Sequence, residues 1–353
     1  MSENKRSIFF MSQAIALAQK GLGYTQTNPL VGCVIVHEGE IIGEGYHTAF
    51  GKPHAEVEAV NSVADKSLLP FCQMYVSLEP CCHYGKTPPC TNLILEHKIP
   101  KVFIASLDPF EKVKGSGVKI LTENGVDVNV GLLEKEARLM NRRFLVNQKF
   151  RRPYIILKWA QSLDAKIAGP AGERLQISGV EANILNHIWR AQEMAIGVGY
   201  NTFVNDNPRL NNRSGNGPQP IPIVFGNYNI SNPQDFFLTQ SEQNPKPIFI
   251  GKNYSNSFSI YPTVLDIHSH SLDNIFEVLY SQGIASIIVE GGAKLLNTLI
   301  QNGFYDEIRF FSSKSMKISH GLDAPALPTL DLVSLDLGQD MLYTFLKEHT
   351  LYS

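Results

Sequence analysis

Residues able to bind a metal and move a proton cluster in the first hundred positions of the chain. His54 is followed by Glu56, and Cys81, Cys82 and Cys90 lie further along. Histidine nitrogen and cysteine sulfur are preferred zinc ligands, and a catalytic zinc site uses three protein ligands and keeps a fourth position for water. Zinc lowers the pKa of that water toward neutrality, and Glu56 can carry its proton to a leaving amine. The pattern predicts hydrolytic removal of an amino group from a heterocycle.

The spacing of the cysteines is specific. Zinc deaminases of nucleobases combine His-x-Glu with Pro-Cys-x-x-Cys, in which the glutamate is not a ligand. Here Cys81 and Cys90 are nine positions apart, within the string Pro-Cys-Cys-His-Tyr-Gly-Lys-Thr-Pro-Pro-Cys. This string resembles the deaminase half of a bifunctional riboflavin-biosynthesis family, diaminohydroxyphosphoribosylaminopyrimidine deaminase / 5-amino-6-(5-phosphoribosylamino)uracil reductase. The resemblance implies zinc ligation by His54, Cys81 and Cys90. Cys82 replaces the family's usual serine and stays open as a competing ligand.

The same resemblance assigns polar residues of the first half to a pocket for the phosphorylated pyrimidine. These residues are Asn28, His47, His83, Lys86 and Asp108. The amide of Asn28 can donate and accept hydrogen bonds along a pyrimidine edge. Simpler interpretations stay open, because Asn28 before Pro29 also suits a turn and His47 also suits a structural histidine.

A glycine pair and a set of family segments predict a second site in the other half of the chain. Gly291 and Gly292 lie between an expected strand and an expected helix, where backbone N–H groups at a helix N-terminus can bind a phosphate. The pattern differs from the Gly-x-Gly-x-x-Gly fingerprint of dinucleotide-binding folds. The neighbouring segments resemble, in order and spacing, the reductase half of the same family, which is similar to dihydrofolate reductase and uses NADPH. They are 158–164, 189–192, 197–202, 205–210 and 290–292.

The resemblance assigns residues in this half position by position. It implies that Lys158 and Asp206 lie nearest the chemistry. Cofactor contacts fall on Ala160, Gln176, Thr202, Asp206, Gly292, Ala293, Lys294, Leu295, Leu296, Asn297 and Thr298. Contacts with the phosphorylated substrate fall on Arg174, Arg190, Leu210, Arg213 and Glu290. Arginine suits this role because a planar guanidinium can bind phosphate through two hydrogen bonds, although any single arginine also suits a solvated surface.

Three positions depart from the family pattern in the second half. Ala165 replaces the usual glycine after Ser-Leu-Asp, Gln176 replaces a usual tryptophan, and Asn207 replaces a second aspartate after Asp206. Because the first aspartate is kept, these departures do not by themselves indicate an inactive domain. They leave open the alternative of a deaminase with a degenerate reductase half.

Composition and charge exclude several classes of function. The chain has 353 residues, a formal net charge of -2 and 43% hydrophobic residues. Such a balance offers no basic field for nucleic acid or for an anionic membrane, and no apolar run approaches the ~18 residues of a membrane span. The five cysteines cluster beside a histidine within residues 33–90, which is typical of a metal site in a reducing compartment rather than of a disulfide framework. We therefore expect a cytoplasmic protein that acts on a small molecule, and a homo-oligomer is compatible with the sequence.

Helix-like and strand-like segments alternate along both halves, which predicts α/β layers. In the first half we expect helices at 8–20, near 54–60, at 90–97 and at 134–148, with strands at 31–36, 41–43, 74–78 and 101–106. The charged break 151–153 marks the expected boundary between domains 1–150 and 151–353. The second half should contain strands at 154–159, 194–198, 221–225, 247–250 and 284–289, and helices at 180–190, 275–280 and 294–301. The resemblance implies a cytidine-deaminase-like three-layer α/β/α domain followed by a dihydrofolate-reductase-like α/β domain.

The favoured hypothesis is a bifunctional enzyme of riboflavin biosynthesis that contains Zn²⁺ and uses NADPH. It would deaminate 2,5-diamino-6-(5-phosphoribosylamino)pyrimidin-4(3H)-one and then reduce the ribosyl group of the product to ribityl. A nucleoside or RNA deaminase with an unrelated second domain is an alternative, which the cysteine spacing and the near-neutral charge disfavour. A structural zinc module is a third alternative and would need a fourth protein ligand.

Overall fold

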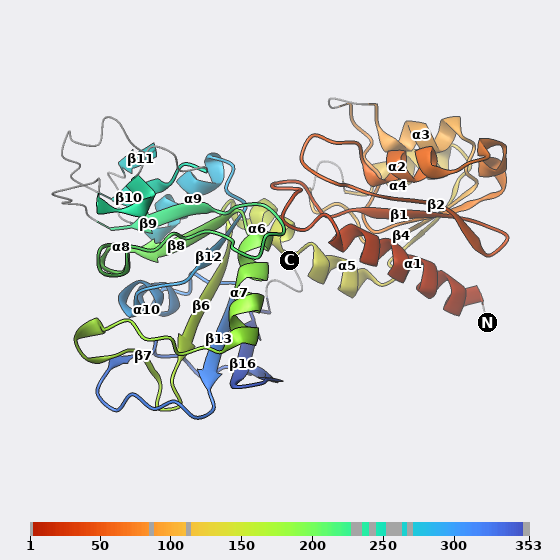
Figure 1. Cartoon of the computed structure of the whole chain (residues 1–353). Coiled ribbons are helices and arrows are strands. Elements are labelled where there is room, and N and C mark those ends of the chain that lie inside the picture. Colours follow the sequence, from red (N-terminus) through yellow and green to blue (C-terminus); the bar gives the residue numbers. More distant parts are fainter. Residues whose placement is uncertain are drawn as a thin grey trace. The chain divides into compact units, whose positions relative to one another are not determined.

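A five-stranded mixed sheet forms the centre of the first half of the chain in this computed structural model (Figure 1). The strand order is β2-β1-β3-β4-β5, in which β1 runs antiparallel to β2 and β3, while β3, β4 and β5 run parallel. The strands are β1 (Gly32–His37), β2 (Glu40–Tyr46), β3 (Gln73–Val76), β4 (Lys101–Ile104) and β5 (Asp127–Val130). The structure describes residues 3–84, 88–110, 114–226, 235–239, 245–251, 263–266 and 271–348.

Helices cover both faces of this sheet. Helices α1 (Glu3–Gln19) and α5 (Glu134–Met140) lie on one face, and α2 (Ala55–Ser62), α3 (Cys90–Glu96) and α4 (Ser116–Glu123) lie on the other, with the short η1 (Lys66–Phe71) (Figure 1). Successive side chains of a strand point to opposite faces, so Val34 and Val36 pack against α1 while Cys33 and Ile35 pack against α2. The three-layer α/β/α prediction is confirmed.

One predicted helix is instead two. The expected helix 134–148 is divided into α5 and α6 (Arg142–Phe150) at Asn141. The Asn141 amide accepts a hydrogen bond from the Leu30 N–H at 2.8 Å and donates one to the Leu30 carbonyl at 2.9 Å. This buried side chain therefore ties the helix break to the loop before β1, a contact between residues far apart in the sequence.

The second half is built on a nine-stranded sheet with the order β11-β10-β9-β8-β12-β6-β13-β16-β15. Neighbouring strands run parallel except β16, which is antiparallel to β13 and β15. The strands are β6 (Tyr154–Gln161), β8 (Ala195–Gly199), β9 (Ile221–Phe225), β10 (Ile248–Gly251), β11 (Thr263–Asp266), β12 (Ser286–Val289), β13 (Glu307–Ser313), β15 (Val333–Leu337) and β16 (Asp340–Leu346). A separate pair joins β7 (Lys166–Ala168) to β14 (Leu322–Asp323).

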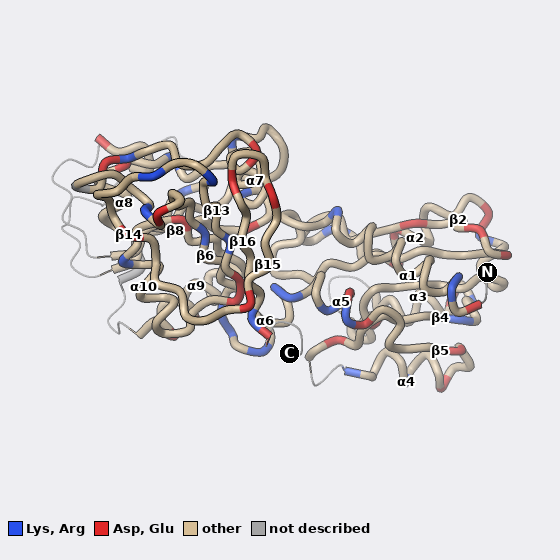
Figure 2. Tube along the Cα trace, turned by 90° about the horizontal axis from the view of Figure 1, so that it is seen from below, with Lys and Arg blue, Asp and Glu red and all other residues tan. Residues whose placement is uncertain are grey.

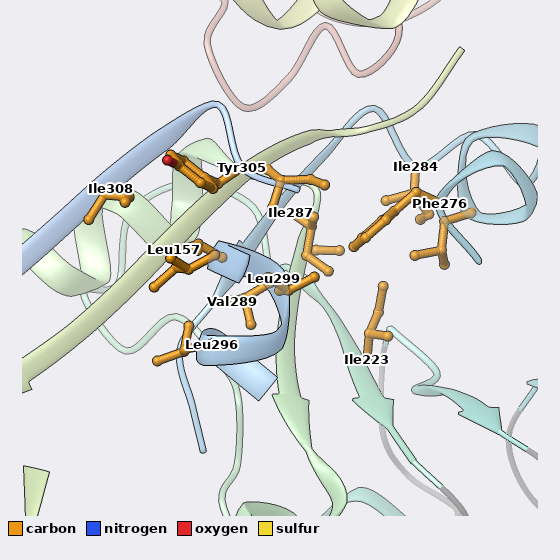
Figure 3. Packing of buried hydrophobic residues seen from close by; sticks show 14 of the residues in the cluster. Leu157, Ile223, Phe276, Ile284, Ile287, Val289, Leu296, Leu299, Tyr305 and Ile308 are labelled. Atoms are coloured by element: carbon orange, nitrogen blue, oxygen red, sulfur yellow. The ribbon is translucent and has the colours of Figure 1, made fainter. Parts of the chain in front are cut away.

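Two helical layers enclose this second sheet. On one face α9 (Leu272–Ser281) and α10 (Ala293–Gln301) bury the largest apolar cluster, in which Phe276, Leu296 and Leu299 meet strand residues such as Leu157 and Ile287 (Figure 3). On the other face lies α7 (Val180–Gln192), followed in the chain by α8 (Tyr200–Asp206). The remaining short helices are η2 (Pro170–Gly172) and η4 (Phe237–Thr239).

Adjacent side chains of β13 show this separation of faces. Phe310 stacks on Trp159 within the α9 and α10 layer, whereas Phe311 stacks on Trp189 of α7. Even-numbered residues of β6 point to the face of the sheet that α7 covers. Lys158 therefore lies on the α7 side, where its ammonium lies over the Phe311 ring. The alternation of helices and strands up to α10 is confirmed in its main elements. The elements that were not predicted are α8, β7, β11, β13, β14, β15 and β16.

The two sheets belong to two compact units, one ending at Phe150 and the other running from Arg151 to Glu348. Basic and acidic residues are interspersed along both units (Figure 2). No helix within the described ranges combines the length and the apolar character needed to cross a membrane.

Candidate active sites

Three potential metal ligands meet beyond the end of β3, where α2 and α3 begin. His54 is the N-cap of α2 and Cys90 is the first residue of α3, while Cys81 follows β3 in a loop. The Nδ1 atom of His54 lies 3.5 Å from the Cys81 sulfur and 3.3 Å from the Cys90 sulfur, and the ligand atoms of all three residues fall within 4.8 Å of one another. One nitrogen and two sulfur donors at this separation fit a tetrahedral zinc ion with one position left for water. Among the described residues, the group that could hold a metal contains His54, Cys81 and Cys90 but not Cys82.

The surroundings of Cys81 favour its thiolate form. The backbone N–H of Cys90 donates a hydrogen bond to the Cys81 sulfur at 3.3 Å, at the N-terminus of α3 where the helix dipole is positive. A side-chain hydrogen bond from Cys90, opposed by burial and helped by His54, lowers the pKa of the Cys81 thiol to about 4. Thiolate is the form that binds a metal, so the site is prepared for zinc.

Glu56 lies in the first turn of α2, beside this group. Its side chain is buried, with 3% exposed. Burial, followed by the negative charge of Cys81, raises the pKa of Glu56 to about 7. A carboxyl group with a pKa near neutrality can both accept and release a proton, as general acid–base catalysis requires.

A cavity of about 370 Å³ opens onto the metal-binding group. It is lined by His54, Glu56 and Cys81, and also by the four described residues that the resemblance assigned to the substrate pocket. Those four are Asn28, His47, His83 and Asp108. The fifth, Lys86, lies outside the described residues. The volume falls in the range of roughly 300–1,000 Å³ typical of small-molecule sites.

Hydrogen bonds orient Asn28 and His47 within this cavity. The Nδ1 atom of His47 lies 3.0 Å from the Pro53 carbonyl, and its Nε2 atom lies 3.0 Å from Asn28 Nδ2. A carbonyl only accepts, so the proton is on Nδ1, and Nε2 accepts from the Asn28 amide. Burial lowers the pKa of His47, in keeping with this neutral form. The Asn28 amide nitrogen is therefore engaged by His47, and its carbonyl oxygen stays available for a ligand in the cavity. His47 both lines the cavity and holds the loop at Pro53.

Glu79 and Phe144 are among the cavity residues that were not identified from the sequence. Glu79 directly precedes the zinc string, and Phe144 comes from α6. The position of Glu79 next to Pro80 was the available signal, because a glutamate beside a metal-binding string is a candidate for a role at the site. Phe144 had no local signal, since only the packing of α6 brings it to the cavity.

In the second unit, a buried carboxylate joins two cations. Glu290 follows β12 and accepts hydrogen bonds from Arg190 of α7, at 2.8 Å from Nε and 2.7 Å from Nη2. Lys158 of β6 places its ammonium 3.7 Å from the same carboxylate. Burial raises the pKa of Glu290, but Arg190 and then Lys158 outweigh it and hold this pKa at about 2. Asn186, one turn before Arg190, adds a hydrogen bond to Glu290 and was not predicted.

The glycine pair lies against Thr202 of α8. Gly292 has φ +73° and is the N-cap of α10. A Cβ atom at Gly292 would stand 2.9 Å from the Thr202 hydroxyl oxygen, and one at Gly291 would stand 3.1 Å from its methyl group. The absence of side chains thus leaves the N-terminal N–H groups of α10 accessible next to a hydroxyl, which fits a cofactor phosphate.

The predicted arginines lie within electrostatic range of one another. Burial lowers the pKa of Arg213, and the charges of Arg190, Arg209 and Arg174 lower it further. Burial and the charges of Arg190 and Arg213 also lower the pKa of His187, to about 4. Cations held together in this way fit an anionic group such as a phosphate. Arg209 and His187 were not assigned from the sequence, although Arg209 lies inside a family segment.

Other predicted residues of this unit have local roles. Burial raises the pKa of Asp206, while the charge of Arg174 lowers it. Leu210 is buried, and Leu296 packs in the core so that only its backbone is available to a cofactor (Figure 3). The Asn297 side chain accepts a hydrogen bond from the Ala326 N–H at 2.9 Å, and the Thr298 hydroxyl donates to the Lys294 carbonyl at 2.8 Å. Ala160, Ala293 and Leu295 stay predicted cofactor contacts.

The departures from the family pattern are accommodated locally. Ala165 adopts a left-handed conformation with φ +56°, which explains a usual glycine at this position. Asn207 has φ +40°, and its side chain binds the Asp235 carbonyl at 3.0 Å and the Phe237 N–H at 2.9 Å. Gln176 donates a hydrogen bond to the Ser178 carbonyl at 2.8 Å. None of these contacts disturbs the Lys158, Arg190 and Glu290 cluster.

The first unit thus has the fold and the ligand set of the zinc-dependent deaminases of nucleobases, and the second has a dihydrofolate-reductase-like fold. Comparison with known proteins agrees for both units. Residues 4–106 match the cytidine and deoxycytidylate deaminase zinc-binding region, and residues 153–313 match the RibD C-terminal domain.

Relatives match along most of the chain. The riboflavin biosynthesis protein RibD of Aquifex aeolicus is 38% identical over 306 residues, which cover 86% of this chain and 85% of that protein. The Escherichia coli protein of the same name is 35% identical, covering 91% and 90%. The crystal structure of a diaminohydroxyphosphoribosylaminopyrimidine deaminase / 5-amino-6-(5-phosphoribosylamino)uracil reductase from Thermotoga maritima superimposes with a TM-score of 0.89 at 32% identity, covering 97% and 99%. This chain belongs to the RibD family of bifunctional deaminases and reductases of riboflavin biosynthesis.

Proposed function

We propose that the first unit deaminates 2,5-diamino-6-(5-phosphoribosylamino)pyrimidin-4(3H)-one. The second unit then reduces the ribosyl group of 5-amino-6-(5-phosphoribosylamino)uracil to ribityl. The observation that carries this proposal is the meeting of His54, Cys81, Cys90 and Glu56 on one cavity. All five cysteines are free thiols, which suits a reducing compartment, and we place both reactions in the cytoplasm.

For the first reaction, His54, Cys81 and Cys90 would hold the zinc ion. Zinc, when bound, supplies the Lewis acid that makes water a nucleophile near neutral pH. Glu56 accepts a proton from the attacking water and delivers it to the amino group as ammonia leaves.

The substrate is held by polar residues of the same cavity. Asn28, oriented by His47, accepts a hydrogen bond from the pyrimidine edge, and His83 and Asp108 line the same cavity.

For the second reaction, the Gly292 turn and Thr202 would hold the phosphate of NADPH. NADPH, when bound, supplies the hydride for C1′ of the ribosyl group. Opening of the sugar ring breaks the bond between C1′ and O4′ and leaves O4′ in need of a proton. We assign this proton to the Lys158 ammonium, which Glu290 keeps charged against the effect of burial. Asp206, near enough to Arg174 to feel its charge, is the second polar group that we assign to this chemistry. We assign Arg174, Arg190 and Arg213 to the substrate phosphate.

The test supplies each substrate to the purified protein with and without NADPH and identifies both products. Glu56→Gln should slow ammonia release by about 10²–10⁴-fold, as expected for loss of a general acid–base group, and should retain zinc. The same variant should reduce the deaminated compound at the normal rate. Asp206→Asn should instead release ammonia at the normal rate and reduce the deaminated compound more slowly.

If each variant loses one reaction and keeps the other, the two reactions belong to separate sites on the chain. Ammonia release at the normal rate from Glu56→Gln would remove Glu56 from the mechanism. Absence of NADPH binding, measured by isothermal titration with and without the deaminated compound, would instead support the alternative of a deaminase only.

A further inference from the structure

The carboxylate of Glu79 is buried beside the deaminase cavity and receives four backbone hydrogen bonds. The residue lines the cavity and is only 5% exposed. Its Oε1 atom accepts from the N–H groups of Gly117 at 2.9 Å and Val118 at 3.3 Å. Its Oε2 atom accepts from the N–H groups of Asp108 at 3.2 Å and Gly115 at 3.0 Å. Hydrogen bonds to a charged acceptor are roughly twice as strong as those between neutral groups.

Three of these donors belong to the start of α4. The first N–H groups of a helix have no partner within the helix, and the N-cap of α4 is Gly115, which has no side chain to bind them. Glu79 therefore caps α4 from a distant part of the sequence, and its charge suits the positive end of the helix. Gly117 permits the close approach, because a Cβ atom there would lie 2.4 Å from the Pro80 carbonyl oxygen.

The fourth donor connects Glu79 to a predicted substrate contact. Asp108 lines the same cavity as Cys81, which is two residues after Glu79. Its backbone N–H is held by Glu79, and its Oδ1 atom accepts a hydrogen bond from the Phe110 N–H at 2.9 Å. The Glu79 N–H in turn donates to the Ser106 carbonyl at 2.9 Å. These bonds join the loop that carries Cys81 to the loop that carries Asp108.

We propose that Glu79 is a positioning residue for deamination, which holds Asp108 at the substrate cavity by binding its backbone N–H and the N-terminus of α4. Both of its carboxylate oxygens are already engaged, so Glu79 acts through Asp108 and not by direct contact with the substrate. This inference rests on the proposed deamination and on the predicted role of Asp108 in binding the substrate.

The test is Glu79→Gln, with Glu96→Gln on the exposed surface of α3 as the matched control. Glutamine replaces one acceptor oxygen with an NH₂ group, so two of the four N–H groups lose their partner in either orientation of the amide. We expect the KM for the diaminopyrimidine phosphate to rise about tenfold, the scale of lost hydrogen bonds to a charged group, with kcat unchanged. Zinc should stay at about one ion per chain, and reduction by the second unit should be unaffected.

Coupling to Asp108 distinguishes positioning from general stabilisation. The double variant Glu79→Gln with Asp108→Asn should have the KM of Asp108→Asn alone, because Glu79 acts through that residue. Gly117→Ala, which displaces α4 without changing the carboxylate, should raise KM in the same direction and keeps the test available if Glu79→Gln does not fold. An unchanged KM in the foldable variants, independent effects in the double variant, or loss of zinc would overturn the positioning role. Absence of ammonia release from the unsubstituted protein would refute the proposed function itself.

Discussion

Replacing Glu290 with glutamine should destabilise the second unit, because this carboxylate neutralises two buried cations. Arg190 binds it at 2.7 and 2.8 Å, and Lys158 lies 3.7 Å away. The pKa of Glu290 is about 2 against an ordinary value of 4.5. At about 1.36 kcal/mol for each pKa unit, this difference corresponds to roughly 3 kcal/mol. Measurements on other buried pairs agree, since removal of one partner costs about 3–5 kcal/mol.

The sign of the pH dependence follows from the lowered pKa. A carboxylate whose pKa is lower in the folded than in the unfolded state stabilises the fold above the unfolded pKa, and this contribution is lost as the pH falls through the folded pKa. Urea unfolding at neutral pH should therefore show the full loss in Glu290→Gln. The difference from the unsubstituted protein should narrow between pH 4.5 and about 2.

The same substitution should move the pH profile of the reductase. Burial lowers the pKa of Lys158, and the charge of Glu290 opposes this effect. Without the carboxylate the Lys158 pKa falls further, so the ammonium form is lost at lower pH. If Lys158 donates the proton to O4′, the alkaline limb of kcat/KM for reduction should shift toward lower pH, and KM should rise because Arg190 loses its orienting partner.

Glu277→Gln, at an exposed position of α9, is the matched control and should change neither stability nor the pH profile. Ammonia release by the first unit should be normal in both variants. A Glu290→Gln protein as stable as the control would show that the carboxylate does not stabilise the cation cluster. An alkaline limb that stays in place would remove Lys158 from the role of proton donor.

Three further predictions concern single residues. Cys81→Ser should abolish both zinc binding and ammonia release, whereas Cys82→Ser should keep about one zinc per chain by elemental analysis; loss of metal in Cys82→Ser would make Cys82 a ligand. Asn28→Ala should raise the deaminase KM about tenfold through loss of a substrate hydrogen bond without affecting reduction, and an unchanged KM would place Asn28 outside the substrate site. Ala165→Gly should stabilise the second unit by about 0.5–1 kcal/mol, because φ +56° is unfavourable for alanine; a lower urea midpoint would contradict this.

The metal-binding residues could be predicted because they carry their signal locally. His54 and Glu56 are two positions apart, and Cys81 and Cys90 belong to one string, so residue type and spacing sufficed to propose them. Most helices and strands up to α10 were also predictable, since apolar periodicity depends on neighbours a few positions away. The exceptions are β7, β11 and α8, which were not predicted. The left-handed turn at Ala165 was not predicted, although the family's usual glycine at that position was an available signal.

The contacts that complete both sites depend on the tertiary structure. Glu79 meets the N-terminus of α4 only because β3 and β4 lie side by side, and Lys158 meets Arg190 and Glu290 only because β6 and β12 pair beneath α7. β13 and β16 gain their hydrogen bonds from partners distant in the chain, and their sequences carried too little local signal to be identified. The sequence by itself thus determined which groups could do chemistry. The packing of the sheets decided which buried charges neutralise one another and which loops are held at the cavity, because these depend on distances between segments that local sequence does not encode.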